Sequence, residues 1–578
     1  MRIVLVYPPP WKIPSPGEPP DGSGDGPPAE YRPGDLDADF FQMPYGVLSL
    51  AAQAMRAGHQ VKVLNLSPFA WTEVEETLGA IDADLYGLSC YTANRRGVFL
   101  AACAIRCYHP VAHIVVGGPH ATALPREMLA HHPDIDTVVC GEGEQTLLEL
   151  AERLVAGRST AGLPGTAFRS PGGAAQLGPA RRPVRDLDEL ASVHEHFATH
   201  LVLTSRGCPF HCTFCAAAAS WGKGYRTHSV PYVLDAIEQA LARVPVKMLQ
   251  VKDDTFSVDR RRVLALCRGI RARGLRFAWS CDSRADLLDE ELLREMRLAG
   301  CERLSLGVES GSPQILRSIG KEISLEAVLR ATELCKRVGI QVRYFMMLGN
   351  RGESTATVRE SLALIERAQP HQYLFACLSV YPGTADFLEL ERRGVLGREA
   401  FFSDDFQELK MPFDASEKDT AFMSELFARH RGIRDCYRPG VRDCEAVLEM
   451  LGDHAGAHLD LGGACYREGD YARAERHVRR ALELGHPLPG LAHNYLACIA
   501  AARGDLAAME EELACAAADP QHAVLLHNWR AVRAWLDGGG PGAGPLPELA
   551  ARHGFELLER TVQPMLPGPL PAGFADWA

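Results

Sequence analysis

Cys208, Cys212 and Cys215 lie in one short stretch with the spacing C-x3-C-x2-C. Thiolates are the usual protein ligands of iron–sulfur clusters, and a tight loop can bring three of them onto one cluster. A 4Fe–4S cube has four irons, so three local cysteines leave one iron open. An open iron can bind a substrate, much as a catalytic zinc site keeps one open position. The spacing therefore indicates a cluster with a vacant coordination position.

A zinc site and three unrelated thiols are the alternatives for this stretch. Structural zinc usually takes four ligands in two separated pairs. No second C-x2-C follows the triad at a suitable distance. The cysteines after residue 415 also lack metal-binding spacing and are expected to be small core residues. The sequence favours the cluster.

The triad follows the first strand of a strand–helix alternation over residues 199–415. Six apolar runs predict strands, namely Leu201–Ser205, Lys247–Lys252, Arg276–Ser280, Arg303–Val308, Gln341–Met347 and Tyr373–Val380. Six such units are too few for a closed eight-fold barrel. The sequence therefore predicts a partial (β/α)6 barrel with its functional residues at the carboxyl ends of the strands.

Residues 1–157 show the same alternation with shorter units. Strands are predicted at 3–7, 61–64, 85–89, 113–116 and 137–140, with helices between them. This pattern predicts a doubly wound, Rossmann-like parallel sheet, whose ligands sit beyond the carboxyl ends of the strands. Ser89, Gly117, Gly118, Gly141 and Glu142 lie at those ends, where glycines allow a ligand to approach the backbone closely.

The order of these motifs resembles that of the cobalamin-binding radical S-adenosylmethionine enzymes, over residues 1 to about 415. The motifs are Pro44-Tyr45-Gly46, Gly117-Gly118-Pro119-His120, Gly141-Glu142-Gly143-Glu144 and the cysteine triad. The resemblance implies three cofactors: a 4Fe–4S cluster on Cys208, Cys212 and Cys215, S-adenosylmethionine on the open iron, and cobalamin on the N-terminal domain. In that family the cluster reductively cleaves S-adenosylmethionine to a 5′-deoxyadenosyl radical.

The resemblance also assigns binding residues. For S-adenosylmethionine they are Phe214 near the adenine, Asp253 or Asp254 at the ammonium, Arg284 at the carboxylate, and Glu309 and Ser310 at the ribose. For cobalamin they are Ser89, Gly117, Gly118, Gly141 and Glu142. The alternatives are strand-end turns and N-caps, which use the same residue types. No catalytic residue is assigned. The fifth strand-end loop departs from the family pattern Gly-Leu-Pro-Gly-Glu, because Asn350 and Arg351 replace its central residues.

Two further segments complete the domain organisation. Residues 158–198 mix glycine, proline and charged residues and are predicted to be a linker. Residues 416–578 are predicted to form an all-α domain, with tetratricopeptide-like repeats at about 454–521. Gly469 and Gly504 mark equivalent turns 35 positions apart. The repeats could dock a protein or peptide partner, or they could form a helical cap that stiffens the barrel.

Bulk properties exclude some classes of function. The net charge of −12 disfavours a nucleic-acid partner. No apolar run approaches the length of a membrane span, and no signal peptide opens the chain. A reducing cytoplasm is therefore the expected location, and it would protect an oxygen-labile cluster.

The two cofactor domains together predict a C-methyltransferase that acts on an unactivated carbon of a natural product or peptide. Such an enzyme needs an electron donor, such as flavodoxin or ferredoxin. A cobalamin-dependent radical cyclase or oxidoreductase would share every motif and is the first alternative. A non-catalytic corrinoid-binding scaffold that acts through its helical repeats is the second.

Overall fold

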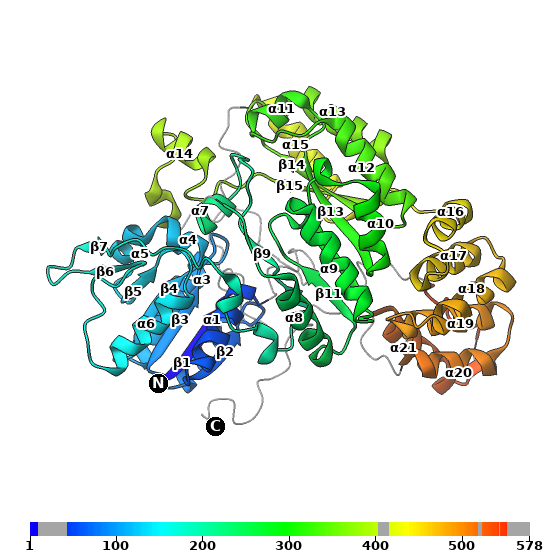
Figure 1. Ribbon diagram of the computed structural model, residues 1–578, viewed down its shortest axis with the longest axis horizontal. Coiled ribbons are helices and arrows are strands. Elements are labelled where there is room, and N and C mark those ends of the chain that lie inside the picture. The colour runs from blue at the N-terminus through cyan, green and yellow to red at the C-terminus, as the bar shows by residue number, and fades with distance from the viewer. Residues whose placement is uncertain (10–42, 223, 403–414, 518–522, 543, 552–578) are drawn as a thin grey trace.

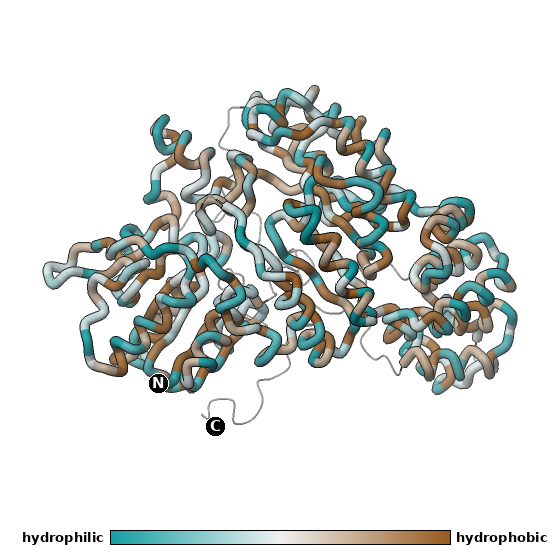
Figure 2. The backbone as a smooth tube through the Cα atoms, viewed as in Figure 1, coloured by the Kyte–Doolittle hydropathy of each residue, from teal (hydrophilic) through white to brown (hydrophobic). Residues whose placement is uncertain are grey.

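The computed structural model describes residues 1–9, 43–222, 224–402, 415–517, 523–542 and 544–551. Figure 1 shows an N-terminal α/β part in blue and cyan, a central α/β part in green, and a helical part in orange beyond the central one. Figure 2 shows hydrophobic segments gathered in the two sheets and on the helix faces that cover them. The predicted α/β class with a helical C-terminal region is confirmed.

The first sheet has seven strands in the order β2-β1-β3-β4-β5-β6-β7. The first five strands in the chain are parallel: β1 (Arg2–Tyr7), β2 (Gln60–Asn65), β3 (Leu85–Ser89), β4 (His113–Gly117) and β5 (Thr137–Val139). Helices follow them in the chain: α1 (Tyr45–Arg56), α2 (Trp71–Ala80), α3 (Arg95–Tyr108), α4 (Pro119–Ala123), α5 (Pro125–His131) and α6 (Glu144–Val155).

Alternate residues of β1 belong to two separate cores. Ile3 and Leu5 pack with α1 and α6 on one face, whereas Val4 and Val6 pack with α2 and α3 on the other. A strand that is buried on both faces reads as a continuous apolar run, which is the pattern at residues 3–7. The doubly wound, Rossmann-like sheet predicted from the sequence is therefore confirmed.

The structure differs from the predicted linker at 158–198. Residues Thr166–Arg169 (β6) and Ala175–Leu177 (β7) extend the first sheet as antiparallel edge strands. Strands of three or four residues between glycines and prolines are too short to show a period-two pattern, so the sequence did not reveal them. The connection to the next part begins after β7 and contains two short 3-10 turns, η2 (Leu187–Glu189) and η3 (Val193–Glu195).

The second sheet forms the predicted partial barrel, with the order β16-β15-β14-β13-β12-β11-β8. Its six parallel strands are β8 (Leu201–Val202), β11 (Met248–Val251), β12 (Ala278–Ser283), β13 (Cys301–Glu309), β14 (Gln341–Leu348) and β15 (Gln372–Cys377). The strand β16 (Arg434–Asp435) joins β15 in the antiparallel direction. The sheet is covered by α8 (Val230–Arg243), α9 (Arg260–Ala272), α10 (Glu290–Leu298), α12 (Leu325–Arg337), α13 (Thr355–Ala368) and α15 (Glu417–Arg429).

The C-terminal part consists of helices that pack against the barrel. They are α16 (Val441–Leu451), α17 (Ala455–Arg467), α18 (Tyr471–Glu483), α19 (Pro489–Ala502), α20 (Leu506–Ala517) and α21 (Ala523–Asp537). Leu491 and Tyr495 of α19 share one buried cluster with Met248 and Ala278, which begin two barrel strands. These contacts favour a cap at the amino ends of the barrel strands, while the tetratricopeptide assignment stays a prediction.

Within the described residues, no helix combines the length and the apolar character that crossing a membrane requires.

Candidate functional site

The cysteine triad lies in the loop between β9 (Ser205–Arg206) and α7 (Ala217–Trp221). The loop follows β8, the first barrel strand, at its carboxyl end. Its backbone is anchored on both sides, because the Thr213 N–H donates to the Ile319 carbonyl at 2.9 Å and the Asp386 N–H donates to the Thr213 carbonyl at 3.1 Å. The end of α11 (Pro313–Ser318) and the start of α14 (Ala385–Arg392) therefore hold the loop in place.

The chemistry of the three thiols fits a cluster rather than a single ion. Burial raises the pKa of the Cys212 thiol, although the charges of Lys321 and Arg284 oppose this shift, and burial raises the pKa of Cys215 to about 11. No three His, Cys, Asp or Glu side chains in the described part of the chain are placed to hold one metal ion. In a 4Fe–4S cube each thiolate binds a different iron, so the three sulfurs need not converge on a single metal position. The Ala217 N–H donates to the Cys215 sulfur at 3.5 Å, which favours the thiolate form of this cysteine.

The two candidate aspartates after β11 differ in their surroundings. Asp253 is buried, and its carboxylate accepts hydrogen bonds from the backbone N–H and hydroxyl groups of Thr204 and Ser205 at 2.5–3.0 Å. Those four bonds use its acceptor sites, so Asp253 fixes the strand that leads into the cysteine loop. Asp254 is exposed and accepts from the Gly207 N–H at 3.1 Å. Of the two, Asp254 has acceptor capacity left for an ammonium group.

Arg284 and Glu309 both lie beside the cysteine loop. The Arg284 guanidinium sits 3.7 Å from the ring centroid of Phe210 and forms a two-bond fork with Asp286 at 3.0 and 3.1 Å. Glu309 ends β13 with a φ of 65°, a strained conformation for a residue with a side chain. The Lys321 ammonium holds its carboxylate at 2.7 Å. The charges predicted to bind S-adenosylmethionine are thus already paired within the protein.

Ser310 is buried, whereas Phe214 is only partly buried. Ser310 is fully buried, its hydroxyl accepts from the Ser312 N–H at 3.1 Å, and it lies 3.3 Å from the Ser361 hydroxyl. The predicted ribose contact therefore has no support at the Ser310 hydroxyl. The Phe214 ring packs against a group of buried hydrophobic residues that includes Met347 and Phe387. Its backbone is therefore the part that can face a ligand.

The predicted cobalamin residues gather at the carboxyl edge of the first sheet. The Cys90 N–H, just after Ser89, donates to the Gly117 carbonyl at 2.7 Å. Gly118 has a φ of 106°, and a Cβ there would lie 2.6 Å from the Cys90 carbonyl oxygen. Gly141 has a φ of 83° and is exposed, with no atom within 4 Å of the corresponding Cβ position. The backbone at this edge is therefore open at Gly141, whereas Gly118 allows the strand ends to pack closely together.

Replacing Gly118 by alanine is expected to weaken cobalamin binding by about tenfold or more, because strain of about 1–3 kcal/mol and a backbone clash displace the strand ends. Absorbance titration with cobalamin measures the affinity. Gly157→Ala is the matched control, since Gly157 also has a positive φ of 61° but open space around it. Unchanged affinity in a folded Gly118→Ala protein would remove Gly118 from the site.

The Glu142 side chain has a different role from the predicted one. Its carboxylate is 6% exposed and accepts from Arg226 at 2.6 and 3.1 Å and from the Val184 N–H at 2.7 Å. Arg206 lies 3.3 Å from the same carboxylate. These four contacts occupy the carboxylate, so Glu142 joins the two α/β parts, and its contact with cobalamin stays a prediction that its backbone could meet.

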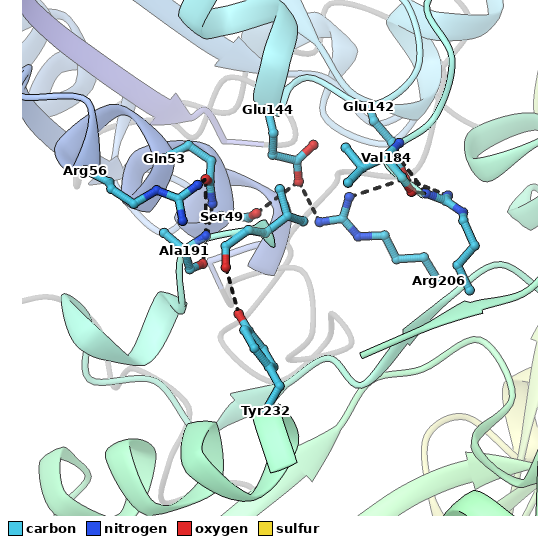
Figure 3. Close-up of polar contacts among 11 residues, drawn as sticks. Ser49, Gln53, Arg56, Glu142, Glu144, Val184, Ala191, Arg206 and Tyr232 are labelled. Carbon is cyan, nitrogen blue, oxygen red and sulfur yellow. Dashed lines mark hydrogen bonds and ion pairs between the residues drawn. The ribbon is translucent and has the colours of Figure 1, made fainter. Parts of the chain in front are cut away.

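Three residues near the site were not found from the sequence. Arg206 directly precedes Gly207, and its guanidinium donates to Glu144 Oε1 at 2.5 Å (Figure 3). Burial disfavours the charge on Glu144, but Arg206 outweighs it and holds the pKa of the carboxyl below its usual range. Lys321 is the third. Glu144 is the last residue of a motif that the sequence already marked, and Arg206 lies two residues before the cysteine triad, whereas Lys321 follows a helix end and carries no local signal.

Two family models match the chain. The B12 binding domain matches residues 36–151, and the radical SAM superfamily matches residues 202–365. Among curated proteins, an uncharacterized methyltransferase of Pyrococcus horikoshii is 28% identical over 354 residues, or 59% of this chain and 77% of that protein. The anaerobic magnesium-protoporphyrin IX monomethyl ester cyclase of Rubrivivax gelatinosus is 28% identical over 335 residues, or 55% of this chain and 60% of that protein.

Solved structures show the same arrangement of folds. The radical S-adenosylmethionine methyltransferase TsrM from Kitasatospora setae aligns with a TM-score of 0.54 at 21% identity, over 68% of this chain and 76% of that chain. The cobalamin-dependent S-adenosylmethionine radical enzyme OxsB aligns with a TM-score of 0.56 at 16% identity, over 100% of this chain and 84% of that chain. With both domain matches and the cysteine loop, the chain is a B12-binding radical S-adenosylmethionine enzyme whose cofactors are a 4Fe–4S cluster, S-adenosylmethionine and cobalamin.

Proposed function

We propose that this enzyme is a C-methyltransferase that acts on an unactivated carbon of a natural product or peptide. The observation that carries the proposal is the meeting of the two cofactor domains at their functional edges. Glu142 and Glu144, after β5, contact Arg206, which lies two residues before Cys208. Radical capture of a methyl group needs both cofactors beside one substrate. When bound, cobalamin carries the methyl group and the cluster supplies the electron that cleaves S-adenosylmethionine.

The chain's own residues bind and orient these groups. Cys208, Cys212 and Cys215 hold the cluster in a loop that Arg284 braces through Phe210. The exposed Asp254 lies above Gly207, where it can accept from the ammonium of S-adenosylmethionine. Positioning is the protein's contribution, because a well-oriented reactant needs no further ordering at the moment of reaction.

For S-adenosylmethionine, further contacts are proposed at Phe214, Arg284 and Glu309. The backbone of Phe214, rather than its ring, faces the adenine in this proposal. Glu309 reaches the ribose with the carboxylate oxygen that Lys321 does not hold. For cobalamin, the strand ends at Ser89, Gly117, Gly118 and Gly141 offer backbone contacts.

The names of relatives support methyl transfer and leave one rival. The cytidylyl-2-hydroxyethylphosphonate methyltransferase of Streptomyces wedmorensis is 24% identical over 423 residues. The 2-(S-pantetheinyl)-carbapenam-3-carboxylate methyltransferase of Streptantibioticus cattleyicolor is 27% identical over 323 residues. Both names describe methyl transfer to a small scaffold, which favours a small-molecule substrate here. The cyclase relatives keep ring formation without methyl transfer as the second candidate.

Methyl-labelled S-adenosylmethionine separates the two candidates. The loaded enzyme is incubated with reductant and candidate substrates, and products are analysed by mass spectrometry. We expect 5′-deoxyadenosine together with a product that has gained one labelled methyl group. A protein with all three loop cysteines replaced should yield neither. Release of 5′-deoxyadenosine with a product of altered ring structure and no label would establish the cyclase instead.

A further inference from the structure

Four charged side chains join the two α/β parts directly beside the cysteine loop. Arg206 and Arg226 come from the paired strands β9 and β10 (Arg226–Thr227), and Glu142 and Glu144 come from the turn that opens α6. Figure 3 shows Arg206, Glu142 and Glu144 together. We call these four residues the interdomain charge cluster. Arg206 and Arg226 lie opposite each other in the two-stranded ladder, so their like charges need both carboxylates nearby.

The cluster is almost sealed from water. The side chains of Arg206, Glu142 and Glu144 are 3%, 6% and 6% exposed, and that of Arg226 is 19% exposed. Ser49 of α1 adds a hydrogen bond to Glu144 Oε1 at 2.9 Å. Within the described residues, Arg206 Nε has no hydrogen-bond partner, so the two carboxylates are its main compensation for lost solvation. Arg206 is therefore held where those carboxylates lie.

The position of Arg206 is transmitted to Cys208 through a single rigid residue. Gly207 has a φ of 86°, and a Cβ there would lie 2.4 Å from the Gly224 carbonyl oxygen. Its N–H is bonded to Asp254 at 3.1 Å. Because Gly207 packs against the Gly224 backbone and is bonded to Asp254, we expect a displacement of Arg206 to displace the first thiolate of the loop.

The Glu144 end of the interdomain charge cluster lies in the N-terminal part that is proposed to bind cobalamin. Glu144 starts α6, and Gly141 precedes it by three residues at the open edge of the first sheet. A carboxylate in the first turn of a helix is also favoured by the helix dipole. One ion pair thus connects the edge proposed for cobalamin with the loop proposed for the iron–sulfur cluster.

We propose that the Arg206–Glu144 pair, with Glu142 and Arg226, sets the separation of the two metal centres, which makes Arg206 a positioning residue for the cysteine loop. The inference rests on the proposed function in one respect, namely that both cofactors bind where that function requires them. It goes further by assigning the control of their separation to a single buried ion pair.

Other contacts keep the two parts together when this pair is weakened. Gln53 of α1 exchanges hydrogen bonds with the backbone of Ala191 at 3.2 and 3.4 Å, and Tyr232 of α8 donates to the Leu190 carbonyl at 3.3 Å. Figure 3 shows both contacts beside the charge cluster. A conservative change at Glu144 should therefore loosen the cysteine loop without separating the domains.

Glu144→Gln is the test variant, because it removes the charge and keeps the shape and the Ser49 contact. Glu149→Gln is the matched control on the same helix. Glu149 forms a two-bond pair with Arg181 at 2.6 and 2.9 Å, but both residues lie away from the cysteine loop. Pulsed dipolar electron paramagnetic resonance of protein with cobalt(II) cobalamin and reduced cluster measures the distance between the metals. We expect a narrow distribution in wild type and Glu149→Gln, and a shifted or broadened one in Glu144→Gln at equal iron and cobalamin content.

Hydrogen exchange on the apoprotein gives a second readout that needs no cofactor. Amides of residues 207–216 should exchange about tenfold faster in Glu144→Gln than in Glu149→Gln, since a bond between charged groups has been lost. Arg206→Lys keeps the positive charge but loses the guanidinium. Its exchange rate should lie between those of Glu144→Gln and Glu149→Gln, and it replaces Glu144→Gln as the test variant if that protein does not fold. Wild-type distance and wild-type exchange in a folded Glu144→Gln protein would overturn the proposal. Wild-type protein that binds no iron would contradict the proposed function instead, and the exchange comparison would still decide the role of the pair.

Discussion

Replacing Cys212 by alanine is expected to abolish cleavage of S-adenosylmethionine and to leave cobalamin binding at the wild-type level. The loss follows because one iron would lack its thiolate, and the other two thiolates of the loop cannot reach it. Cobalamin binding should persist because its proposed contacts lie at the edge of the first sheet, which keeps its own two cores. Iron analysis, the spectrum of the reduced cluster and 5′-deoxyadenosine release measure the first effect, and absorbance titration measures the second.

The same result is expected for Cys208→Ala and Cys215→Ala. Cys515→Ala is the matched control, because Cys515 of α20 is exposed in the helical part, and its prediction as a core residue is wrong. It should retain wild-type iron content and turnover. Formation of 5′-deoxyadenosine at the wild-type rate by Cys212→Ala would refute the assignment of the loop.

Replacing Arg297 by alanine is expected to lower the free energy of unfolding by about 3–5 kcal/mol, the usual cost of breaking a buried ion pair. The Arg297 side chain is 0% exposed and pairs with Glu302 at 2.5 Å and with Asp460 of α17 at 2.8 Å. Its removal leaves two carboxylates facing each other where the helical part meets the barrel. Urea denaturation measures the loss, and such a loss is a large share of the stability of a typical domain.

Arg480→Ala is the matched control for this prediction. Arg480 also pairs with two carboxylates, Asp453 and Glu483, but its side chain is 42% exposed. The expected loss is much smaller than for Arg297→Ala, because water replaces the lost partners. Equal losses in the two variants would show that the helical part does not support the barrel. Folded Arg297→Ala protein should still bind iron and cobalamin, since neither proposed site includes residues of α16–α21.

The sequence by itself determined both α/β folds and the place of the cysteine loop. Residues 3–6 of β1 are apolar at every position because both faces of this strand are buried, and such a run can be recognised in the sequence without a structure. The cysteine loop could also be predicted from the sequence, because its three thiolates lie close together in the chain and can therefore meet on one cluster. Gly118 and Gly141 were predicted to allow a ligand to approach the backbone closely. Both have a positive φ, which glycine adopts more readily than other residues.

Only the tertiary structure decided which polar residues are free to bind a ligand. Asp253 and Glu142 have residue types that suit a cofactor, yet their oxygens are taken by Thr204, Ser205 and Arg226. Arg206 pairs with Glu144 across 62 positions, and Arg297 pairs with Asp460 across 163. Local spacing determines what a contiguous loop can bind, but the partner of a buried charge depends on which elements pack together, and that information lies in no short stretch of sequence.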